Sequence, residues 1–231
     1  MEAKSGKALT LRKMRIFMIC RLTPMRLSSR SLMGMEVRDL TKGNEASVYC
    51  ERHLEEVLKG TPEYKSEDFQ NAFIKSFIKM DERLGSVEGK KELAEIGKAT
   101  EKKESPLMQI LKGDNGGEGS PEDMGLDAKG CTANVVLIKE GVIYCANAGD
   151  SRAVICNRGK AENLSEDHKP DDKIERDRIY KAGSTVSPDG RVDGNLNLSR
   201  SIGDLKHKQV PNLTPAEQPI TCVPDVKKRS I

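Results

Sequence analysis

The stretch that decides the fold reads Ala146-Asn147-Ala148-Gly149-Asp150-Ser151-Arg152 and stands between two apolar runs, Val142-Ile143-Tyr144-Cys145 and Ala153-Val154-Ile155-Cys156. Apolar and β-branched residues are typical of strands, whereas Gly, Asp and Ser are typical of turns. The pattern therefore predicts a hairpin whose bend carries a carboxylate. Two interpretations stay open here: a surface turn that needs Gly and Asp only for their backbone conformations, and a turn that presents Asp150 to a metal ion.

Helices are predicted in the first half of the chain. Residues 45–58 carry apolar side chains at near-helical spacing, with Glu and Arg between them. Ser66 is a candidate cap for a second helix, whose apolar stripe runs through residues 69–80 and is expected in the core. Residues 90–103 are charged and helix-prone, and the stretch 113–125, rich in Gly, Asp, Ser and Pro, is predicted to be a loop.

Strands dominate the pattern after Gly130. Residues 132–138, 142–146 and 153–156 read as three strands of an antiparallel meander. A helix is predicted at residues 171–181, stopped by Gly183. Because helices and antiparallel strands fall in separate blocks, the expected fold class is α+β.

Composition limits the classes of function. The 231 residues are 32% charged and 36% hydrophobic, contain no Trp, and carry a formal net charge of +3. This charge is too small to indicate a nucleic-acid or membrane partner, and no apolar stretch is long enough to span a bilayer. The N-terminus also lacks a clear signal peptide. We therefore expect one soluble domain that binds neither nucleic acid nor membrane.

The six cysteines are scattered along the chain and show no C-x-x-C spacing for zinc or redox chemistry. Reduced thiols in a cytoplasmic or nuclear protein are the expectation from this pattern.

Seven blocks of sequence, in this order, resemble the metal-dependent protein phosphatases of type 2C. The resemblance extends over about residues 43–226, and so many ordered blocks are highly specific. The blocks are Gly130-Cys131-Thr132-Ala133, Ala146 to Arg152, Leu164-Ser165-Glu166-Asp167-His168-Lys169-Pro170, Ala182-Gly183, Gly190-Arg191-Val192-Asp193-Gly194, Leu198-Ser199-Arg200-Ser201-Ile202-Gly203-Asp204 and Pro224-Asp225-Val226.

The resemblance implies a fold and an activity. The fold would be a four-layer sandwich of two antiparallel sheets flanked by helix pairs. The activity would be hydrolysis of phosphoserine and phosphothreonine in phosphoprotein substrates by a monomer that uses Mn²⁺ or Mg²⁺. Such hard cations take oxygen ligands, and a two-metal site both generates hydroxide and neutralises the phosphoryl oxygens. By resemblance, Asp150 is a metal ligand near an additional ion beside the two-metal centre.

Other matched residues are expected to serve the scaffold. Arg200, Gly203 and Asp204 match a block whose role is structural before it is catalytic. His168 is expected to be a hydrogen-bonded scaffold residue, because a lone His is more often that than a ligand. Asp193 and Asp225 are expected to be loop residues.

The chain departs from the family pattern at both ends. The principal metal motif, Asp-Gly-His-Gly-Gly after an apolar residue, should stand immediately before Asn44, but only its last glycine, Gly43, is present. The chain stops at Ile231, before the blocks that would supply the remaining metal aspartates. We therefore expect a C-terminally truncated domain that is inactive as written. The alternative is a phosphatase-like binding module that has no catalytic role.

A shift of reading frame explains the missing motif. If the Leu32 codon ends in G, reading Ser31 to Val37 from each third base gives an apolar residue, Asp, Gly, one of His, Tyr, Asn or Asp, Gly, and then Gly or Ser. This hypothesis makes the basic, Met- and Arg-rich segment 1–42 out of frame or intron-derived, and 43–231 the partial phosphatase domain. A mitochondrial transit peptide is the competing interpretation of the N-terminus.

Overall fold

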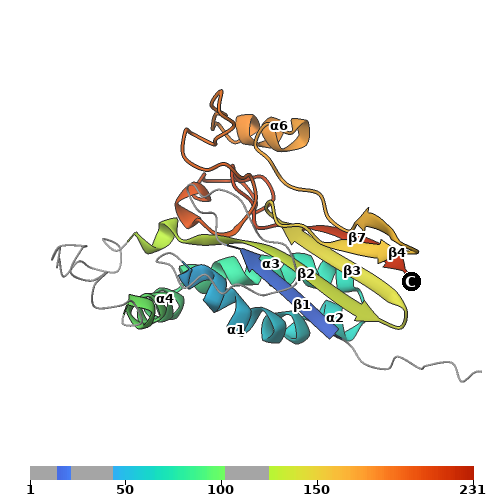
Figure 1. Ribbon diagram of the computed structural model, residues 1–231. Coiled ribbons are helices and arrows are strands. Elements are labelled where there is room, and N and C mark those ends of the chain that lie inside the picture. Colours follow the sequence, from blue (N-terminus) through green and yellow to red (C-terminus); the bar gives the residue numbers. More distant parts are fainter. Residues whose placement is uncertain (1–14, 22–43, 102–124) are drawn as a thin grey trace, which may run out of the picture.

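A central antiparallel sheet organises the molecule. The computed structural model describes residues 15–21, 44–101 and 125–231. The strand order is β1-β2-β3-β7 (Figure 1), and β6 pairs with the beginning of β2. The strands are β1 (Arg15–Arg21), β2 (Gly130–Lys139), β3 (Val142–Ala148), β6 (Ile202–Gly203) and β7 (Asp225–Ser230).

Strands β2 and β3 form the hairpin at the centre of this sheet. Their register pairs Ala133 with Ala148 and Lys139 with Val142, across a turn at Glu140 and Gly141. Both strands and this turn were expected from the sequence, and β2 is bounded as predicted to within two residues.

Strand β1 lies within the segment 1–42 that the sequence assigns outside the domain. It pairs antiparallel with β2 along its whole length, from Arg15 opposite Ile138 to Arg21 opposite Thr132. Residues 1–14 and 22–43, which include the site of the missing motif, lie outside the described residues. The reading-frame origin of this segment therefore stays a prediction.

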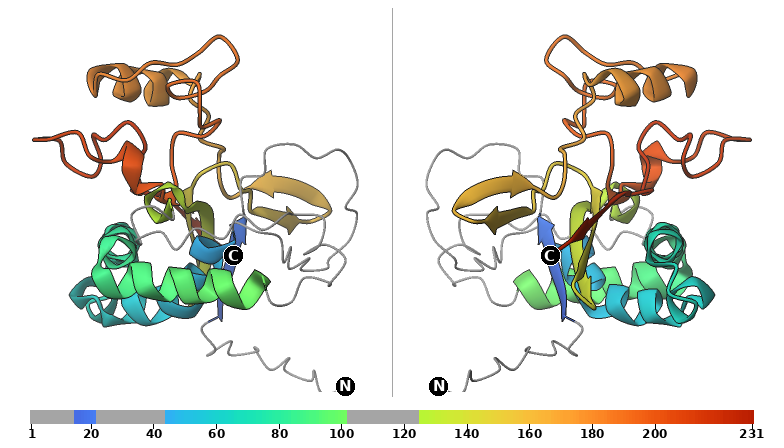
Figure 2. Two further views of the ribbon diagram at one scale, coloured as in Figure 1. Left: turned by 90° about the vertical axis from the view of Figure 1, so that its left-hand side faces the viewer. Right: turned by 90° about the vertical axis from the view of Figure 1, so that its right-hand side faces the viewer.

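Four helices form a layer on one face of the sheet (Figures 1 and 2). Their apolar stripes meet the sheet in one core, in which Leu54, Phe73, Phe77 and Leu137 are fully buried or nearly so. Burial of this apolar area is the main force that holds the layer on the sheet. The helices are α1 (Glu45–Gly60), α2 (Pro62–Lys65), α3 (Phe69–Gly85) and α4 (Val87–Glu101).

The N-cap predicted at Ser66 is wrong. Ser66 ends α2, and its backbone N–H donates to the carbonyls of Pro62 and Tyr64. The residue that caps α3 is Asp68, whose carboxylate accepts a hydrogen bond from the N–H of Asn71. Both residue types are good caps, so the sequence left a choice that the extra turn of α2 decides.

The hairpin predicted across Asp150 is also wrong. Strand β4 (Val154–Asn157) pairs with β5 (Lys160–Asn163) in a separate two-stranded sheet, and not with β3. This small sheet lies on the opposite side of the central sheet from the helices (Figure 2). Residues Ile143 and Cys145 of β3 pack there against Ala153 and Leu164. The residues between β3 and β4 therefore carry the chain off the central sheet instead of reversing it.

Helix α6 (Lys173–Lys181) stands apart from both the helix layer and the central sheet (Figure 1). It has its own small core of Ile179, Val192, Leu198 and Ile220. The helix begins two residues later than predicted because Asp172 has an extended backbone, with φ −63° and ψ 137°. Gly183 follows the end of the helix with φ +86°, as expected for a helix stop.

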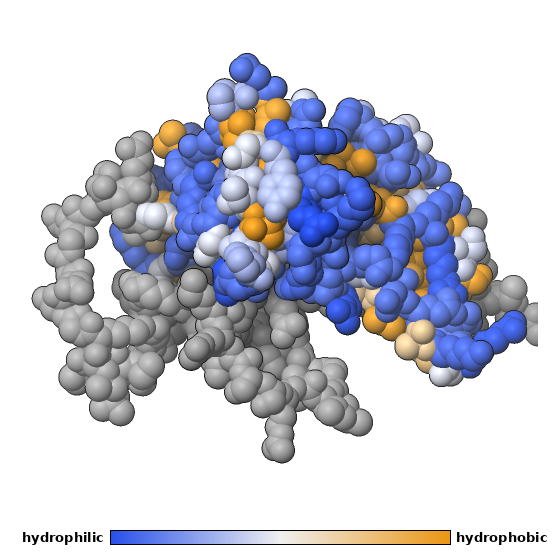
Figure 3. All heavy atoms as spheres, turned by 90° about the horizontal axis from the view of Figure 1, so that it is seen from above, coloured by the Kyte–Doolittle hydropathy of each residue, from blue (hydrophilic) through white to orange (hydrophobic). Residues whose placement is uncertain are grey.

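The surface of the α6 side is mostly hydrophilic, with small separated hydrophobic spots (Figure 3). Large exposed apolar residues are scattered over several elements, among them Val87, Val154 and Ile174. Within the described ranges, no helix has both the length and the apolar character needed to cross a membrane. The α+β class with antiparallel sheets is confirmed, whereas most of the predicted loop 113–125 lies outside the described residues.

Candidate functional site

Asp150 follows a glycine that the fold requires. Gly149 has φ +119°, a region that residues with a Cβ rarely adopt. A Cβ at this position would lie 2.4 Å from Cγ2 of Thr132 and 3.1 Å from the carbonyl oxygen of Arg200. The turn therefore lies directly against β2 and the segment before β6, and Asp150 leaves it with a side chain that is 23% exposed.

The buried side-chain amides of Asn134 and Asn147 hydrogen-bond the turn and the strands next to it. Nδ2 of Asn147 donates to the carbonyl of Gly149 at 3.0 Å and to that of Glu166 at 2.7 Å. Nδ2 of Asn134 donates to Oδ1 of Asn147 and to Oγ of Ser165, both at 3.0 Å. These bonds connect β2, β3 and the segment after β5 beneath Asp150, so the turn rests on a rigid base.

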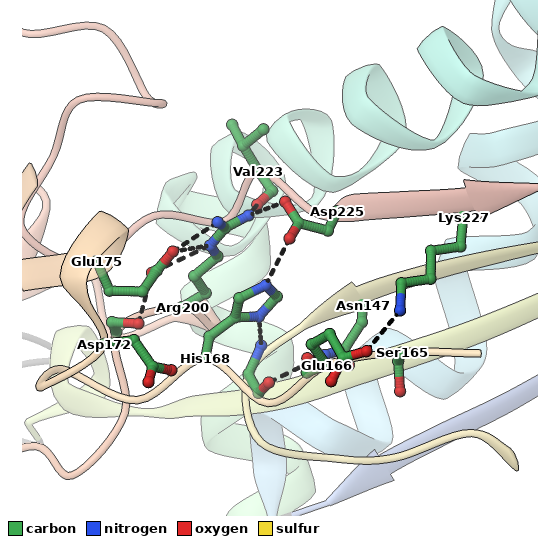
Figure 4. A network of polar contacts seen from close by, with 12 residues as sticks. Asn147, Ser165, Glu166, His168, Asp172, Glu175, Arg200, Val223, Asp225 and Lys227 are labelled. Atoms are coloured by element: carbon green, nitrogen blue, oxygen red, sulfur yellow. Dashed lines mark hydrogen bonds and ion pairs between the residues drawn. The ribbon is translucent and has the colours of Figure 1, made fainter. Parts of the chain in front are cut away.

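His168 holds the same turn from the side (Figure 4). The ring Nδ1 of His168 accepts a hydrogen bond from the backbone N–H of Gly149 at 3.1 Å. The backbone N–H of His168 donates to the carbonyl of Gly149, also at 3.1 Å. Its Nε2 lies 3.1 Å from Oδ2 of Asp225, and the side chain is only 4% exposed. The expectation of a hydrogen-bonded scaffold role for His168 agrees with these contacts.

Lys169 is the ionic partner of Asp150. Its Nζ lies 2.5 Å from Oδ2 of Asp150, and its side chain is 39% exposed. The neighbouring Arg152 makes a bidentate pair with Asp167, at 2.7 and 3.0 Å. Two charge pairs thus join the turn to the segment just before α6.

Arg200 lies between two carboxylates. It donates to both oxygens of Glu175 on α6, with a shortest contact of 2.6 Å, and to Oδ1 of Asp225 at 2.7 Å (Figure 4). Burial by itself would raise the pKa of Glu175, but the hydrogen bonds and charges of Arg200 and Arg178 outweigh it and lower this pKa to about 2. Hydrogen bonding from His168, together with the Arg200 charge, lowers the pKa of Asp225.

Gly203 and Asp204 make contacts that agree with the structural role expected for them: Gly203 with Asp81, and the N–H of Asp204 with the carbonyl of Lys129 at 2.8 Å. The N–H of Gly203 donates to Oδ1 of Asp81 on α3 at 2.7 Å, and a Cβ on Gly203 would lie 2.3 Å from the carbonyl oxygen of Lys129. Burial raises the pKa of Asp204. Asp81 also binds the buried Nζ of Lys208 at 2.5 Å, so this cluster joins the helix layer to the segment after β6.

A known protein family matches the part of the chain that contains these contacts. The family described as "Protein phosphatase 2C" matches residues 88–231, which include the Asp150 turn, His168, Arg200 and Asp225. The chain belongs to this family.

Relatives in the 2C family cover most of the chain. The "Probable protein phosphatase 2C 3" of Paramecium tetraurelia is 42% identical over 189 residues, which are 82% of this chain and 55% of that protein. The "Probable protein phosphatase 2C 21" of Arabidopsis thaliana is 34% identical over 196 residues, with 80% and 55% covered. The chain thus spans about half the length of these relatives.

A solved structure shares the 2C fold. A phosphatase from a pathogenic strain of Toxoplasma gondii matches with a TM-score of 0.54 and 23% identity, over 81% of this chain and 61% of that one. This likeness supports the phosphatase fold that the sequence predicted.

The described residues do not by themselves fit the metal centre of a 2C phosphatase. No group of three or more His, Cys, Asp or Glu side chains that could hold a metal ion occurs in the described ranges. Asp150 is a single carboxylate, and Lys169 already balances its charge. Its role as a metal ligand therefore stays a prediction from the resemblance.

Asp225 makes contacts that sequence reasoning did not predict. It was expected in a loop, but it begins β7 and binds both His168 and Arg200. Strand β7 has no regular alternation of apolar and polar residues, so no local signal could have found it. Asp193 does lie in a loop, where Oδ1 accepts a hydrogen bond from the N–H of Thr185 at 2.8 Å.

Proposed function

We propose that this protein hydrolyses phosphoserine and phosphothreonine in phosphoproteins, with Mn²⁺ or Mg²⁺ as its metal. The observation that supports this most strongly is the family match over residues 88–231, within which the Asp150 turn is held by His168 and Lys169. Because the chain spans about half the length of its relatives, the proposal concerns the activity of the complete domain.

Within this proposal, Asp150 is the carboxylate that this part of the chain contributes to the metal site. Carboxylate oxygen is the ligand type that both cations prefer. The turn is rigid and the side chain is half-buried, so its position is fixed before any ligand arrives. A cation at Asp150 would compete with the ammonium group of Lys169, which makes Lys169 a determinant of affinity.

The test compares two polypeptides in the release of phosphate from a phosphothreonine peptide, with Mn²⁺ and with EDTA. One is the 231-residue chain; the other has Asp-Gly-His-Gly-Gly restored before Asn44 and is extended to the length of the relatives. We expect the first to be inert and the second to show metal-dependent turnover. Asp150→Asn in the second should reduce that turnover, because the amide is a weaker ligand than the carboxylate.

The matched control is Asp177→Asn in the restored polypeptide. Asp177 is an exposed carboxylate on α6 that pairs only with Lys173 among the contacts described, so its loss should leave turnover unchanged. An inactive restored polypeptide would contradict the proposal and favour a binding module. Turnover by the unrestored chain would show that the motif is not needed.

We further propose that the protein acts as a monomer in the cytoplasm or nucleus. Five of the cysteines support a reducing compartment, since their thiols are free: Cys50, Cys131, Cys145 and Cys222, which are buried, and Cys156, which is exposed. Fractionation of cells that express the protein, with gel filtration of the soluble fraction, tests both statements. Recovery in a secreted fraction, or as a stable dimer, would contradict them.

A further inference from the structure

We propose that His168 is a positioning residue for Asp150, which acts through a single neutral tautomer that Asp225 selects. This inference rests on the proposed function only for the role of Asp150 as a metal ligand. The hydrogen bonds of His168 can be measured without phosphatase activity.

His168 makes hydrogen bonds with both backbone polar groups of Gly149, its N–H and its carbonyl. The ring accepts the N–H of this residue, and the backbone N–H of His168 donates to its carbonyl. That carbonyl belongs to the planar peptide unit whose nitrogen is that of Asp150, so its direction sets where the Asp150 Cα lies. The next residue, Lys169, then contacts the Asp150 carboxylate itself. Two consecutive residues thus fix two consecutive residues of the turn.

The partners of the ring decide its tautomer. A backbone N–H can only donate, so Nδ1 of His168 must be unprotonated where it faces Gly149. The proton is then on Nε2, which donates to Oδ2 of Asp225. The side chain of Asp225 is 59% exposed, but its carboxylate still accepts from one ring nitrogen, and such a hydrogen bond selects the tautomer in which the other nitrogen is an acceptor.

Asp225 is held in turn by Arg200. Oδ1 of Asp225 accepts from Nη1 of Arg200 at 2.7 Å, while Oδ2 faces the ring of His168. The same guanidinium is anchored by Glu175, whose side chain is 4% exposed. A continuous path of polar contacts therefore runs from α6, through β7, to the turn at Gly149 (Figure 4). The position of the carboxylate of Asp150 therefore depends on Glu175 of α6, on Asp225 of β7 and on Arg200 in the segment before β6.

Two conservative substitutions separate the two ring contacts. In His168→Asn, Oδ1 takes the place of Nδ1 and can still accept the N–H of Gly149, but the contact with Asp225 is lost. In His168→Gln, the amide nitrogen takes the place of Nε2 and can still donate to Asp225, but the acceptor for Gly149 is lost. His53→Gln is the control, because His53 pairs with Glu92 in the helix layer, far from the turn in sequence.

We expect the two variants to differ in amide hydrogen exchange at Gly149, measured by NMR on the 231-residue chain. His168→Gln should exchange this amide about tenfold faster than the unmodified protein, because one hydrogen bond of about 1.4 kcal/mol is lost. His168→Asn and His53→Gln should stay close to the unmodified rate. Equal effects of Asn and Gln would overturn the proposal, since a residue that only fills space would not distinguish them.

A second measurement needs no variant. The ¹⁵N chemical shifts of the His168 ring in the unmodified protein should show Nε2 protonated and Nδ1 unprotonated. The opposite tautomer, or a mixture of the two, would overturn the proposal even where a variant fails to fold. Neither readout requires phosphatase activity, so an inert protein with the expected tautomer would reject the proposed function and leave the positioning role in place.

Discussion

At the residue scale, Gly149 and Asp150 show why the turn has to contain a glycine. The backbone at Gly149 has a positive φ, and the space where a Cβ would stand is taken by the side chain of Thr132. Both the conformation and the packing therefore exclude other residues. The carboxylate of Asp150 owes its fixed position to the residue before it as much as to its own contacts with Lys169.

Gly149→Ala should destabilise the protein by about 3 kcal/mol, because strain at positive φ and a steric overlap with Thr132 add together. Gly159→Ala is the matched control: it also has a positive φ, of +79°, but no atom lies within 4 Å of its Cβ position. The control should cost only about 1 kcal/mol. Urea unfolding of both variants measures the difference, and equal losses would show that packing at Gly149 contributes nothing.

At the element scale, α6 is joined to the rest of the molecule by a buried ionic network in addition to the small apolar core around Ile179. Glu175 is the buried contact point: it accepts hydrogen bonds from Arg178 on its own helix and from Arg200 and Ser199 before β6. The free-energy cost of removing buried charges from water is offset only while every charged partner is present. The attachment of α6 is therefore specific and sensitive to the loss of a single group.

Glu175→Gln should destabilise the protein by about 3 kcal/mol, because the buried guanidinium groups of Arg178 and Arg200 lose the carboxylate that they share, and only Arg200 keeps another, Asp225. Asp177→Asn on the same helix is the control, since it removes an exposed carboxylate paired with Lys173 and should have no measurable effect. Thermal unfolding of the two variants provides the measurement. If both behave as the unmodified protein does, the Glu175 network does not stabilise the fold.

At the scale of the whole molecule, one apolar core joins the helix layer to the central sheet. The core contains the fully buried Phe73 and Phe77 of α3, which meet edge to face with ring centroids 6.5 Å apart. On the other face, the described apolar cluster is smaller, and in it Ile143 and Cys145 of β3 pack against Ala153 and Leu164, which flank the small β4–β5 sheet. Most of the stability is therefore expected to come from the helix side.

Phe73→Ala should destabilise the protein by about 4 kcal/mol, because it opens a cavity in the core between α3 and the sheet. Lys79→Ala on the exposed side of α3 is the control and should leave stability unchanged, as its pair with Glu82 is exposed to solvent. Chemical unfolding followed by circular dichroism measures both. A small loss for Phe73→Ala would mean that the helix layer contributes little to the fold.

Stability should also fall in acid. The pKa of Glu175 is about 2 in the folded protein, against an ordinary value of 4.5, so the unfolded chain binds a proton more readily. Its contribution is therefore fully present above about pH 4.5 and is lost as the pH falls toward 2; the lowered pKa of Asp225 acts in the same direction. Unfolding midpoints across this window should fall more steeply for the unmodified protein than for Glu175→Gln, and parallel curves would contradict the assignment.

The sequence by itself determined the elements whose signals are local. The helices α1 and α3, the strands β2 and β3 and the stop at Gly183 follow from apolar periodicity and turn residues, which act over a few neighbouring positions. The ordered blocks around Asp150 also determined the family, because they record the residues that the fold requires.

Only the tertiary structure decided where the chain goes after Gly149 and what surrounds Asp150. A hairpin and a crossing to a second sheet begin with the same local sequence, and the contacts of Thr132, Asn147 and His168 with Gly149 distinguish them. The roles of β5, β7 and Asp225 depend likewise on partners far along the chain. Such contacts gain their energy only when distant segments meet, so no short stretch of sequence contains their signal.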